Sequence, residues 1–129
     1  MKRQTLILYA ALLLLTGVAA GAFGAHAIRH AVTPDRLATW DTAVLYQLVH
    51  GLGIMLIAQF YASHKHKLLR IAAYVMLVGT LLFSGSLYLL VLTGTIWLAY
   101  VTPMGGMLFL IAWALVAVTA WTTKSQDTT

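Results

Sequence analysis

The stretch TLILYAALLLLTGVAAGAFGAHA, residues 5–27, contains no Asp, Glu, Lys or Arg. A helix needs about 20 consecutive apolar residues to cross the hydrocarbon core of a bilayer, so this stretch is long enough to span one. Over the whole chain of 129 residues, 61% are hydrophobic and only 9% are charged. About a quarter of the residues in a soluble domain are charged, so the sequence predicts an integral membrane protein.

Three further apolar stretches follow, at 42–62, 68–93 and 103–121. The second helix is expected to begin earlier, at Pro34, because Thr33 suits an N-cap and proline suits a first helical turn. Thr102 and Pro103 are expected to start the last helix in the same way. The long unbroken apolar runs lack the alternation of barrel strands. We therefore predict an all-α bundle of four transmembrane helices, with residues 1–129 forming a single domain.

The basic residues predict the orientation of the bundle. A cytoplasmic N-terminus places only Arg29 and Arg36 outside, which favours an N-in, C-in arrangement in a bacterial inner (plasma) membrane as a multi-pass protein. The first span also resembles a cleavable signal peptide, but its apolar run continues past the small residues at 20–22 for a full span. The six basic residues placed inside are Lys2, Arg3, Lys65, Lys67, Arg70 and Lys124.

The net charge of +5 does not predict nucleic-acid binding, because the basic residues lie at the edges of apolar runs. That placement is typical of contacts with lipid headgroups, so membrane lipids are the expected partners. The chain has no cysteine, which excludes disulfides, thiolate metal sites and cysteine nucleophiles. The histidines of HKHK, residues 64–67, are interpreted as headgroup contacts, and we expect no metal.

Haem ligation by both His26 and His50 is not expected, because about ten residues of helix, or about 15 Å, separate them in height. We therefore expect no cofactor. A catalytic triad of serine, His50 and Asp41 fails similarly, because nine residues of one helix place Asp41 about 13 Å from His50. No enzymatic activity and no catalytic residue are predicted.

Small residues recur every fourth position in the first span, at Gly17, Gly21 and Ala25. Such positions share one helix face and let another backbone approach closely. We interpret this face as packing between the helices of one chain, and homo-oligomerisation is the alternative. The full set of glycines predicted to pack is Gly17, Gly21, Gly24, Gly85, Gly105 and Gly106.

Polar residues gather at one depth of the predicted bundle. His50 lies roughly 15 Å below the outer boundary, about midway through the bilayer, and shares a helix face with Tyr46. The third span runs outward and brings its serines and a tyrosine to a similar height, whereas His26 comes close in height to Asp41. The candidate ligand-binding residues or polar network are His26, Asp41, Tyr46, His50, Ser84, Ser86 and Tyr88.

Two interpretations of this cluster remain open. The first is a set of interhelical hydrogen bonds, in which Ser84 and Ser86 bond to nearby backbone or to His50 and each bond contributes about 0.6 to 2 kcal/mol. The second is a site open to the outer face, in which His50 and Asp41 titrate, because ionisable residues inside membranes often mark ligand or proton pathways.

The ordered segments GAFGAHA (21–27), LFSGSLYLL (82–90) and TPMGGMLFLIAW (102–113) resemble a known family. This family consists of small four-helix membrane proteins of unknown function and includes bacterial YgdD-type proteins and a eukaryotic transmembrane relative. The resemblance implies an inner-membrane location and a compact helical fold, but no established activity. The residues that carry it are Gly24, His26, Trp40, Tyr46, His50, Ser84, Gly85, Ser86, Tyr88, Thr102, Pro103, Gly105, Gly106 and Trp113.

Two functions follow from these observations as hypotheses. In the first, an outward-facing polar pocket binds or passes a small ligand, ion or proton, and the side chains of Tyr46, His50, Ser84, Ser86 and Tyr88 converge on one cavity. In the second, the protein is a non-enzymatic assembly or stabilising subunit of a larger membrane complex. The same side chains then satisfy one another, no cavity remains, and a stripe of glycine and alanine faces the lipid.

Overall fold

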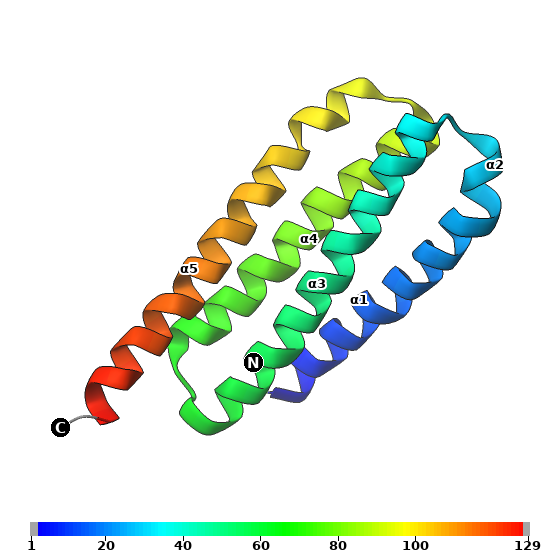
Figure 1. Ribbon diagram of the computed structural model, residues 1–129. Helices are drawn as coiled ribbons and strands as arrows, with labels where there is room; N and C mark the ends of the chain where they lie inside the picture. Colours follow the sequence, from blue (N-terminus) through cyan, green and yellow to red (C-terminus); the bar gives the residue numbers. More distant parts are fainter. Residues whose placement is uncertain (1–2, 128–129) are drawn as a thin grey trace.

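The computed structural model describes residues 3–127, with side chains as far as Lys124, and contains four long helices (Figure 1). Each is long and apolar enough to cross a membrane, and no strand occurs within residues 3–127. The prediction of an all-α bundle with four membrane-spanning helices is confirmed. The elements are α1 (Arg3–Phe23), a π-helical turn (Gly24–Ile28), α2 (Arg29–Ala31), α3 (Pro34–His64), α4 (Lys67–Thr93), a 3₁₀ turn (Ile96–Tyr100) and α5 (Thr102–Asp127).

The start of α3 agrees with the sequence prediction. Pro34 occupies the first turn, and the Thr33 hydroxyl accepts a hydrogen bond from the Arg36 amide at 3.4 Å. The start of α5 differs, because Thr102 does not act as a cap. The Val101 carbonyl already accepts hydrogen bonds from the backbone amides of residues 104 and 105. The Thr102 hydroxyl instead bonds with the Ser86 hydroxyl at 2.6 Å and donates to the Leu98 carbonyl at 3.4 Å.

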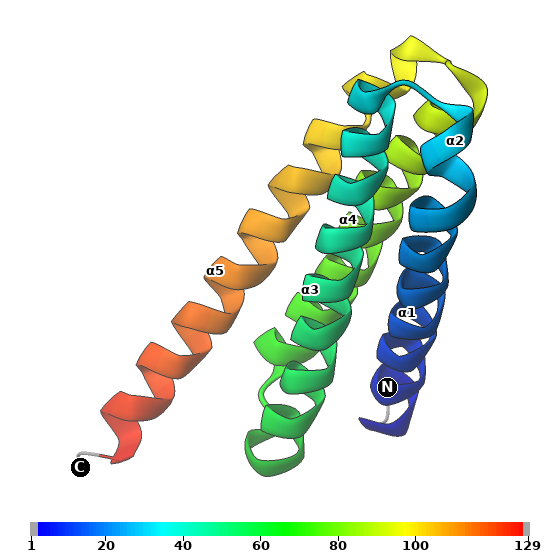
Figure 2. The same ribbon diagram turned by 45° about the vertical axis from the view of Figure 1, so that its right-hand side comes forward.

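Helices α3 and α4 form the centre of the bundle. Helix α1 packs on α3, and α5 packs on α4, so α1 and α5 lie on opposite flanks (Figure 1). Both termini lie at one end of the molecule, here called the termini end, together with the connection at residues 65–66. The turns at residues 32–33 and 94–101 lie at the opposite end. Towards the termini end α5 diverges from α3, as Figure 2 shows.

The common end of the two termini agrees with an even number of spans, while the cytoplasmic location of that end stays a prediction. The described basic residues at the termini end are Arg3, Lys65, Lys67, Arg70 and Lys124, and Lys2 lies outside the described residues. The opposite end carries Arg29 and Arg36. Of these, Arg36 donates a hydrogen bond from its guanidinium to the Leu90 carbonyl at 3.1 Å and so joins α3 to the end of α4.

The glycine stripe of the first span packs against α3. A Cβ atom added at Gly17 would lie 2.8 Å from the Leu48 side chain, and one at Gly24 would lie 2.6 Å from the Trp40 indole. Gly21 faces Val44 in the same way. The glycines of this stripe therefore allow α1 to approach α3 closely within one chain, whereas Ala25, the third residue of the predicted stripe, is exposed.

The glycines of α4 and α5 agree with the prediction only in part. A Cβ at Gly105 would lie 2.5 Å from the Phe83 amide nitrogen, so Gly105 is a point of close backbone approach between α5 and α4. Gly106 would meet the Phe83 ring only at 3.9 Å, an ordinary contact. The packing role predicted for Gly85 is wrong, because no atom lies within 4 Å of the Cβ it would carry. The residue of α4 that faces Gly105 is Gly79, which sequence reasoning did not select.

Candidate functional site

The candidate residues from the sequence fall into separate groups on different sides of α3 and α4. His26 and Asp41 belong to none of these groups. Both are exposed, and neither side chain makes a hydrogen bond within the part of the chain that the structure describes. On α3 the buried face carries Trp40, Ala43 and Gln47, so the neighbouring Asp41 points away from it. The predicted membership of His26 and Asp41 in a shared polar network is wrong for this reason.

The first polar group is centred on Gln47, a residue that sequence reasoning did not select. Its amide nitrogen donates to the Leu13 carbonyl at 2.9 Å and to the Thr16 hydroxyl at 2.8 Å, both on α1. The Tyr88 hydroxyl of α4 donates to the Gln47 amide oxygen at 2.6 Å. Gln47 is 6% exposed. This one side chain therefore links three helices and leaves its own polar atoms satisfied.

Trp40 closes this group towards the opposite end. Its indole Nε1 donates to the Ala20 carbonyl at 2.8 Å, just before the π-helical turn. The rings of Trp40 and Tyr88 lie 4.6 Å apart between centroids and are tilted by 58°, a favourable arrangement for an aromatic pair. Because Gly24 has no Cβ atom, the Trp40 indole can occupy the space beside it. The group thus ties α1, α3 and α4 together.

Ser84 and Ser86 hydrogen-bond on opposite sides of α4. The Ser84 hydroxyl donates to the Ala43 carbonyl of α3 at 2.7 Å, and Ser84 is 2% exposed. The Ser86 hydroxyl bonds to the Phe83 carbonyl and to Thr102 at the start of α5. Ser84 therefore joins α4 to the second span, as expected, whereas Ser86 joins it to the fourth. Neither serine bonds to His50.

His50 lies on the side of α3 that faces α5 and is 4% exposed. The indole Nε1 of Trp113 lies 3.1 Å from His50 Nε2, and His50 Nδ1 lies 2.8 Å from the Tyr46 carbonyl. An indole N–H only donates, so Nε2 is the acceptor and Nδ1 carries the proton that it donates to the carbonyl. His50 is therefore a neutral imidazole with both nitrogens engaged.

Aromatic rings from three helices surround His50. Its ring is stacked on Phe109 of α5, with centroids 3.6 Å apart and planes 8° apart. The Tyr46 ring packs on Phe83 of α4 at 4.5 Å and lies 5.9 Å from His50. The close approach of α5 to α4 at Gly105 brings Phe109 to this level. The imidazole therefore has ring contacts with Tyr46, Phe109 and Trp113.

Two grooves flank the central pair of helices. The α3–α5 groove has a volume of about 590 Å³ and is lined mainly by apolar and aromatic side chains, among them Tyr46, His50, Phe83, Leu110 and Trp113. The α1–α4 groove, of about 320 Å³, is lined on its polar side by Thr16, Gln47, Ser84 and Tyr88. The five residues expected to converge on one cavity therefore lie in three places. Tyr46 and His50 line the α3–α5 groove, Ser84 and Tyr88 line the α1–α4 groove, and Ser86 contacts Thr102.

The chemistry available in these groups is hydrogen bonding and aromatic packing. No buried side-chain nitrogen or oxygen of the described residues lacks a hydrogen-bond partner. No cluster of three or more His, Asp or Glu that could hold a metal occurs among the residues described. His50 has no nitrogen left for a haem iron while it bonds to Trp113 and Tyr46. Neither Ser84 nor Ser86 hydrogen-bonds to a side chain that could act as a general base.

Comparison with known proteins finds related membrane proteins over nearly the whole chain. A family model described as "Protein of unknown function (DUF423)" matches residues 20–106. The UPF0382 inner membrane protein YgdD of Escherichia coli (strain K12) is 35% identical over 120 residues, which cover 93% of this chain and 92% of the relative. No solved structure matches.

Two further relatives show the same extent of similarity. A UPF0382 membrane protein of Haemophilus influenzae is 38% identical over 120 residues, covering 91% of this chain and 96% of the relative. The UPF0382 membrane protein YwdK of Bacillus subtilis (strain 168) is 36% identical over 119 residues, with the same coverage of 91% and 96%. The similarity therefore includes all four membrane-spanning helices.

Proposed function

We propose that this chain, which belongs to the UPF0382 (DUF423) family of membrane proteins, binds a lipophilic ligand in the α3–α5 groove and does not catalyse a reaction. Family membership confirms the resemblance seen in the sequence and the location as a multi-pass protein of a bacterial inner (plasma) membrane. The function of the family is unknown, so the support for a ligand comes from the geometry of the groove.

The observation that carries the proposal is the Tyr46 hydroxyl. Its ring lines the α3–α5 groove and is 39% exposed, and no hydrogen bond joins its hydroxyl to another residue of the described chain. Tyr46 lies about 18 Å from the start of a helix that is about 46 Å long, which places it within the hydrocarbon core. An unpaired hydroxyl is costly there, so a bound molecule with a hydrogen-bonding group at Tyr46 stabilises the arrangement.

The remaining walls suit a molecule that is mostly apolar. Phe83, Leu110 and Trp113 line the same groove, and its volume falls in the range of about 300–1,000 Å³ typical of small-molecule sites. The groove lies on the lipid-facing side of the bundle, so a ligand enters from the bilayer. A lipid-like molecule with a carbonyl or hydroxyl group near one end matches this combination of one polar group and aromatic walls.

The passage of an ion or proton receives less support than binding. His50 is neutral, and both of its ring nitrogens are occupied by Trp113 and the Tyr46 carbonyl. The other polar group, around Gln47, lies on the far side of the contact between α3 and α4. A proton pathway requires a continuous series of polar groups, and these two groups are not joined by a described hydrogen bond.

The test is to purify the protein from its native membrane in a mild detergent and to identify the bound molecules by mass spectrometry. Tyr46→Phe removes one hydrogen bond and is expected to lower the co-purified ligand about two- to tenfold. Tyr100→Phe changes an exposed tyrosine in the 3₁₀ turn outside the groove and serves as the matched control. Gly106→Leu fills the groove and should abolish binding. Equal amounts of every bound molecule in all four proteins would overturn the proposal.

A second candidate is a non-enzymatic assembly or stabilising subunit of a larger membrane complex. It is favoured by the α1–α4 groove, where Gly85 leaves open space for a side chain of a partner helix. Gly85→Trp should then reduce the mass of the native complex on gels of solubilised membranes, whereas Gly85→Ala should preserve it. A protein that migrates as a monomer in every variant would remove this candidate.

A further inference from the structure

The α3–α5 groove offers a ligand a single kind of polar contact. Among the described side chains that line it, only those of Tyr46, His50 and Trp113 contain nitrogen or oxygen. The Trp113 indole N–H and both ring nitrogens of His50 are already used in hydrogen bonds. The Tyr46 hydroxyl is therefore the side-chain group of this lining to which a ligand can bond.

Tyr46 lies deeper in the membrane than the polar part of a phospholipid. Helix α3 has 31 residues, so Tyr46 stands about 5 Å from its midpoint. Phe83, whose ring packs on that of Tyr46 at 4.5 Å, also stands about 5 Å from the midpoint of its own helix, α4. In a hydrocarbon core about 30 Å thick, this level is about 10 Å below the nearer boundary. A charged headgroup stays outside the core because its transfer inside is costly, so a phospholipid does not bring its polar groups to Tyr46.

The lining of the groove also selects a neutral ligand. No Asp, Glu, Lys or Arg is among the described residues that line it. His50 is neutral as well, because its Nε2 accepts the hydrogen bond from Trp113. A charged ligand would therefore lie in the hydrocarbon core without a counter-ion, which is costly.

Hydrogen bonding at Tyr46 favours a carbonyl over a hydroxyl. A carbonyl oxygen only accepts, so the Tyr46 hydroxyl can donate to it and no donor is left without a partner. A ligand hydroxyl would bring a second donor to a pair in which only one donor is used. An unpaired donor is costly in hydrocarbon. The single hydroxyl of the groove is thus matched best by a molecule that has an acceptor and no donor.

The walls of the groove suit a flat ring with an apolar tail. The rings of Tyr46 and Trp113 are 39% and 40% exposed, so each leaves part of its surface to a ligand. Packing between aromatic rings is favourable beyond the area that it buries. Met107 and Leu110 line the same groove and are 60% and 68% exposed. These apolar side chains provide a path from the rings to the surrounding lipid.

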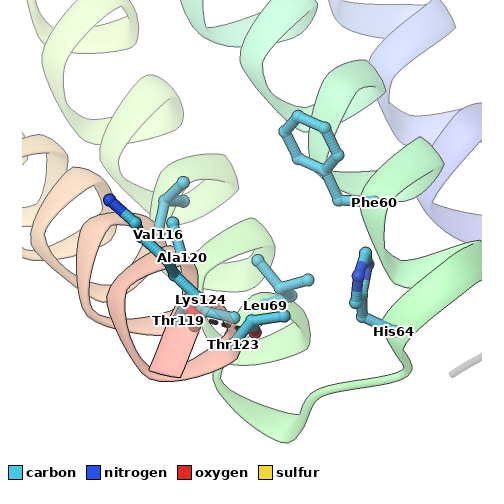
Figure 3. A pocket seen from close by; sticks show the side chains of 8 residues that line it. All are labelled: Phe60, His64, Leu69, Val116, Thr119, Ala120, Thr123 and Lys124. Carbon is cyan, nitrogen blue, oxygen red and sulfur yellow. Dashed lines mark hydrogen bonds between the residues drawn. The ribbon is translucent and has the colours of Figure 1, made fainter. Parts of the chain in front are cut away.

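A second opening between α3 and α5, at the termini end, has apolar walls but no such hydroxyl. Its volume is about 290 Å³, with Phe60 on one side and Ala120 on the other (Figure 3). The hydroxyls of Thr119 and Thr123 each donate to a backbone carbonyl of α5 at 2.8 Å. His64 is the last residue of α3 and lies outside the hydrocarbon core. This opening suits a hydrocarbon chain and serves as a comparison site without a free donor in the core.

We infer, resting on the ligand site proposed above, that the ligand of the α3–α5 groove is a neutral quinone. One ring carbonyl accepts a hydrogen bond from the Tyr46 hydroxyl, the ring packs beside Trp113, and the tail passes Leu110 into the bilayer. A quinone has no charged headgroup, so its polar ring reaches the depth of Tyr46 from within the hydrocarbon core. The assignment concerns binding alone and requires no reaction.

Photoaffinity labelling of the whole protein in nanodiscs tests this assignment, with an azide-bearing quinone of short isoprenoid tail as the probe. Mass spectrometry of the labelled peptides should place the label on the segments around Tyr46 and Leu110. An unlabelled quinone should displace the probe about two- to tenfold better than a benzene derivative with the same tail and no carbonyl, because only the quinone accepts the hydrogen bond.

Four variants separate the hydrogen bond from the space in the groove. In Tyr46→Phe the quinone and its carbonyl-free analogue should compete equally, whereas Tyr100→Phe, outside the groove, should preserve the difference. Gly106→Leu should remove the label because it fills the groove. Ala120→Phe fills the comparison opening and should leave the label unchanged.

The outcomes distinguish a wrong ligand class from a wrong site. Equal competition by the two molecules in the unmodified protein would overturn the quinone assignment, and so would a label that is lost in Ala120→Phe and kept in Gly106→Leu. A phospholipid that co-purifies with the native protein and is lost in Gly106→Leu would also overturn it, while the proposed ligand groove would stand. If Gly106→Leu changes neither the label nor any co-purified molecule, both the assignment and the proposed function are wrong.

Discussion

Gly105→Ala tests the contact between α4 and α5 that holds the aromatic groove in place. The new Cβ would lie 2.5 Å from the Phe83 amide nitrogen and 2.8 Å from the Gly79 carbonyl oxygen. Carbon atoms in ordinary contact are about 3.5–4.0 Å from their neighbours, so α5 must move by roughly 1 Å. Both obstructing groups are backbone, and no side-chain rotation can relieve them.

The expected cost follows from two opposing effects. Overpacking of this kind costs about 1–3 kcal/mol, and a contact between backbones belongs at the upper end of that range. Alanine also favours a helix over glycine by up to about 1 kcal/mol. We therefore expect Gly105→Ala to lower the free energy of unfolding by about 1–2 kcal/mol. Phe109 lies one turn after Gly105 on α5, so the shift should also loosen the stack of its ring on His50.

Gly85→Ala is the matched control, because no atom lies within 4 Å of its added Cβ. It should be neutral or stabilise the protein by up to about 1 kcal/mol through helix propensity alone. The assay is unfolding in mixed micelles by titration with SDS, followed by tryptophan fluorescence. A difference of about 2 kcal/mol between the two alanine variants is expected. Equal stability of both variants would refute the close approach of α4 and α5 at Gly105.

Three further predictions concern the hydrogen bonds between helices. Gln47→Leu should lower the free energy of unfolding by about 1–3 kcal/mol in the same titration, because it leaves the Tyr88 hydroxyl unpaired, and a neutral result would contradict the network. Tyr88→Phe removes only the donor and should cost less, about 0.6 to 2 kcal/mol. Trp113→Phe should free His50 Nε2, so that the ¹⁵N chemical shift of that nitrogen changes; an unchanged shift would exclude the Trp113 hydrogen bond.

The number and position of the membrane helices could be predicted from the sequence because hydropathy and length report them directly. The start of α3 was predictable as well, since Thr33 and Pro34 act locally. The rotation of each helix about its axis was harder to predict. In a bilayer the lipid-facing and the protein-facing surfaces are both apolar, so hydropathy does not distinguish them.

Gly85 and Ser86 illustrate this difficulty. Both lie in the stretch that was expected to face the second span, because their depth in the bilayer is similar to that of Tyr46 and His50. Successive helical residues are rotated by about 100°, so Ser84 and Ser86 point to sides about 200° apart. Ser84 accordingly reaches α3 and Ser86 reaches α5. Equal depth in the bilayer does not imply proximity, because the helical rotation separates these two residues.

Gln47 was overlooked for a different reason. The candidate set held ionisable and hydroxyl side chains, whereas the amide of Gln47 is the side chain that connects three helices. A signal was present, since Gln47 is a polar residue inside an apolar run and lies three residues before His50. Its partner atoms include the Leu13 carbonyl, which no sequence pattern marks. The contact of Trp113 with His50 was likewise invisible, because it depends on how α5 crosses α3.

The most direct test of the ligand groove is an experimental structure of protein purified from its own membrane into nanodiscs. The account predicts ordered density between Tyr46 and Leu110, within hydrogen-bonding distance of the Tyr46 hydroxyl. His50 should remain stacked on Phe109. An empty, collapsed groove, or density that instead connects Gln47 with Ser84 across the α1–α4 groove, would contradict it.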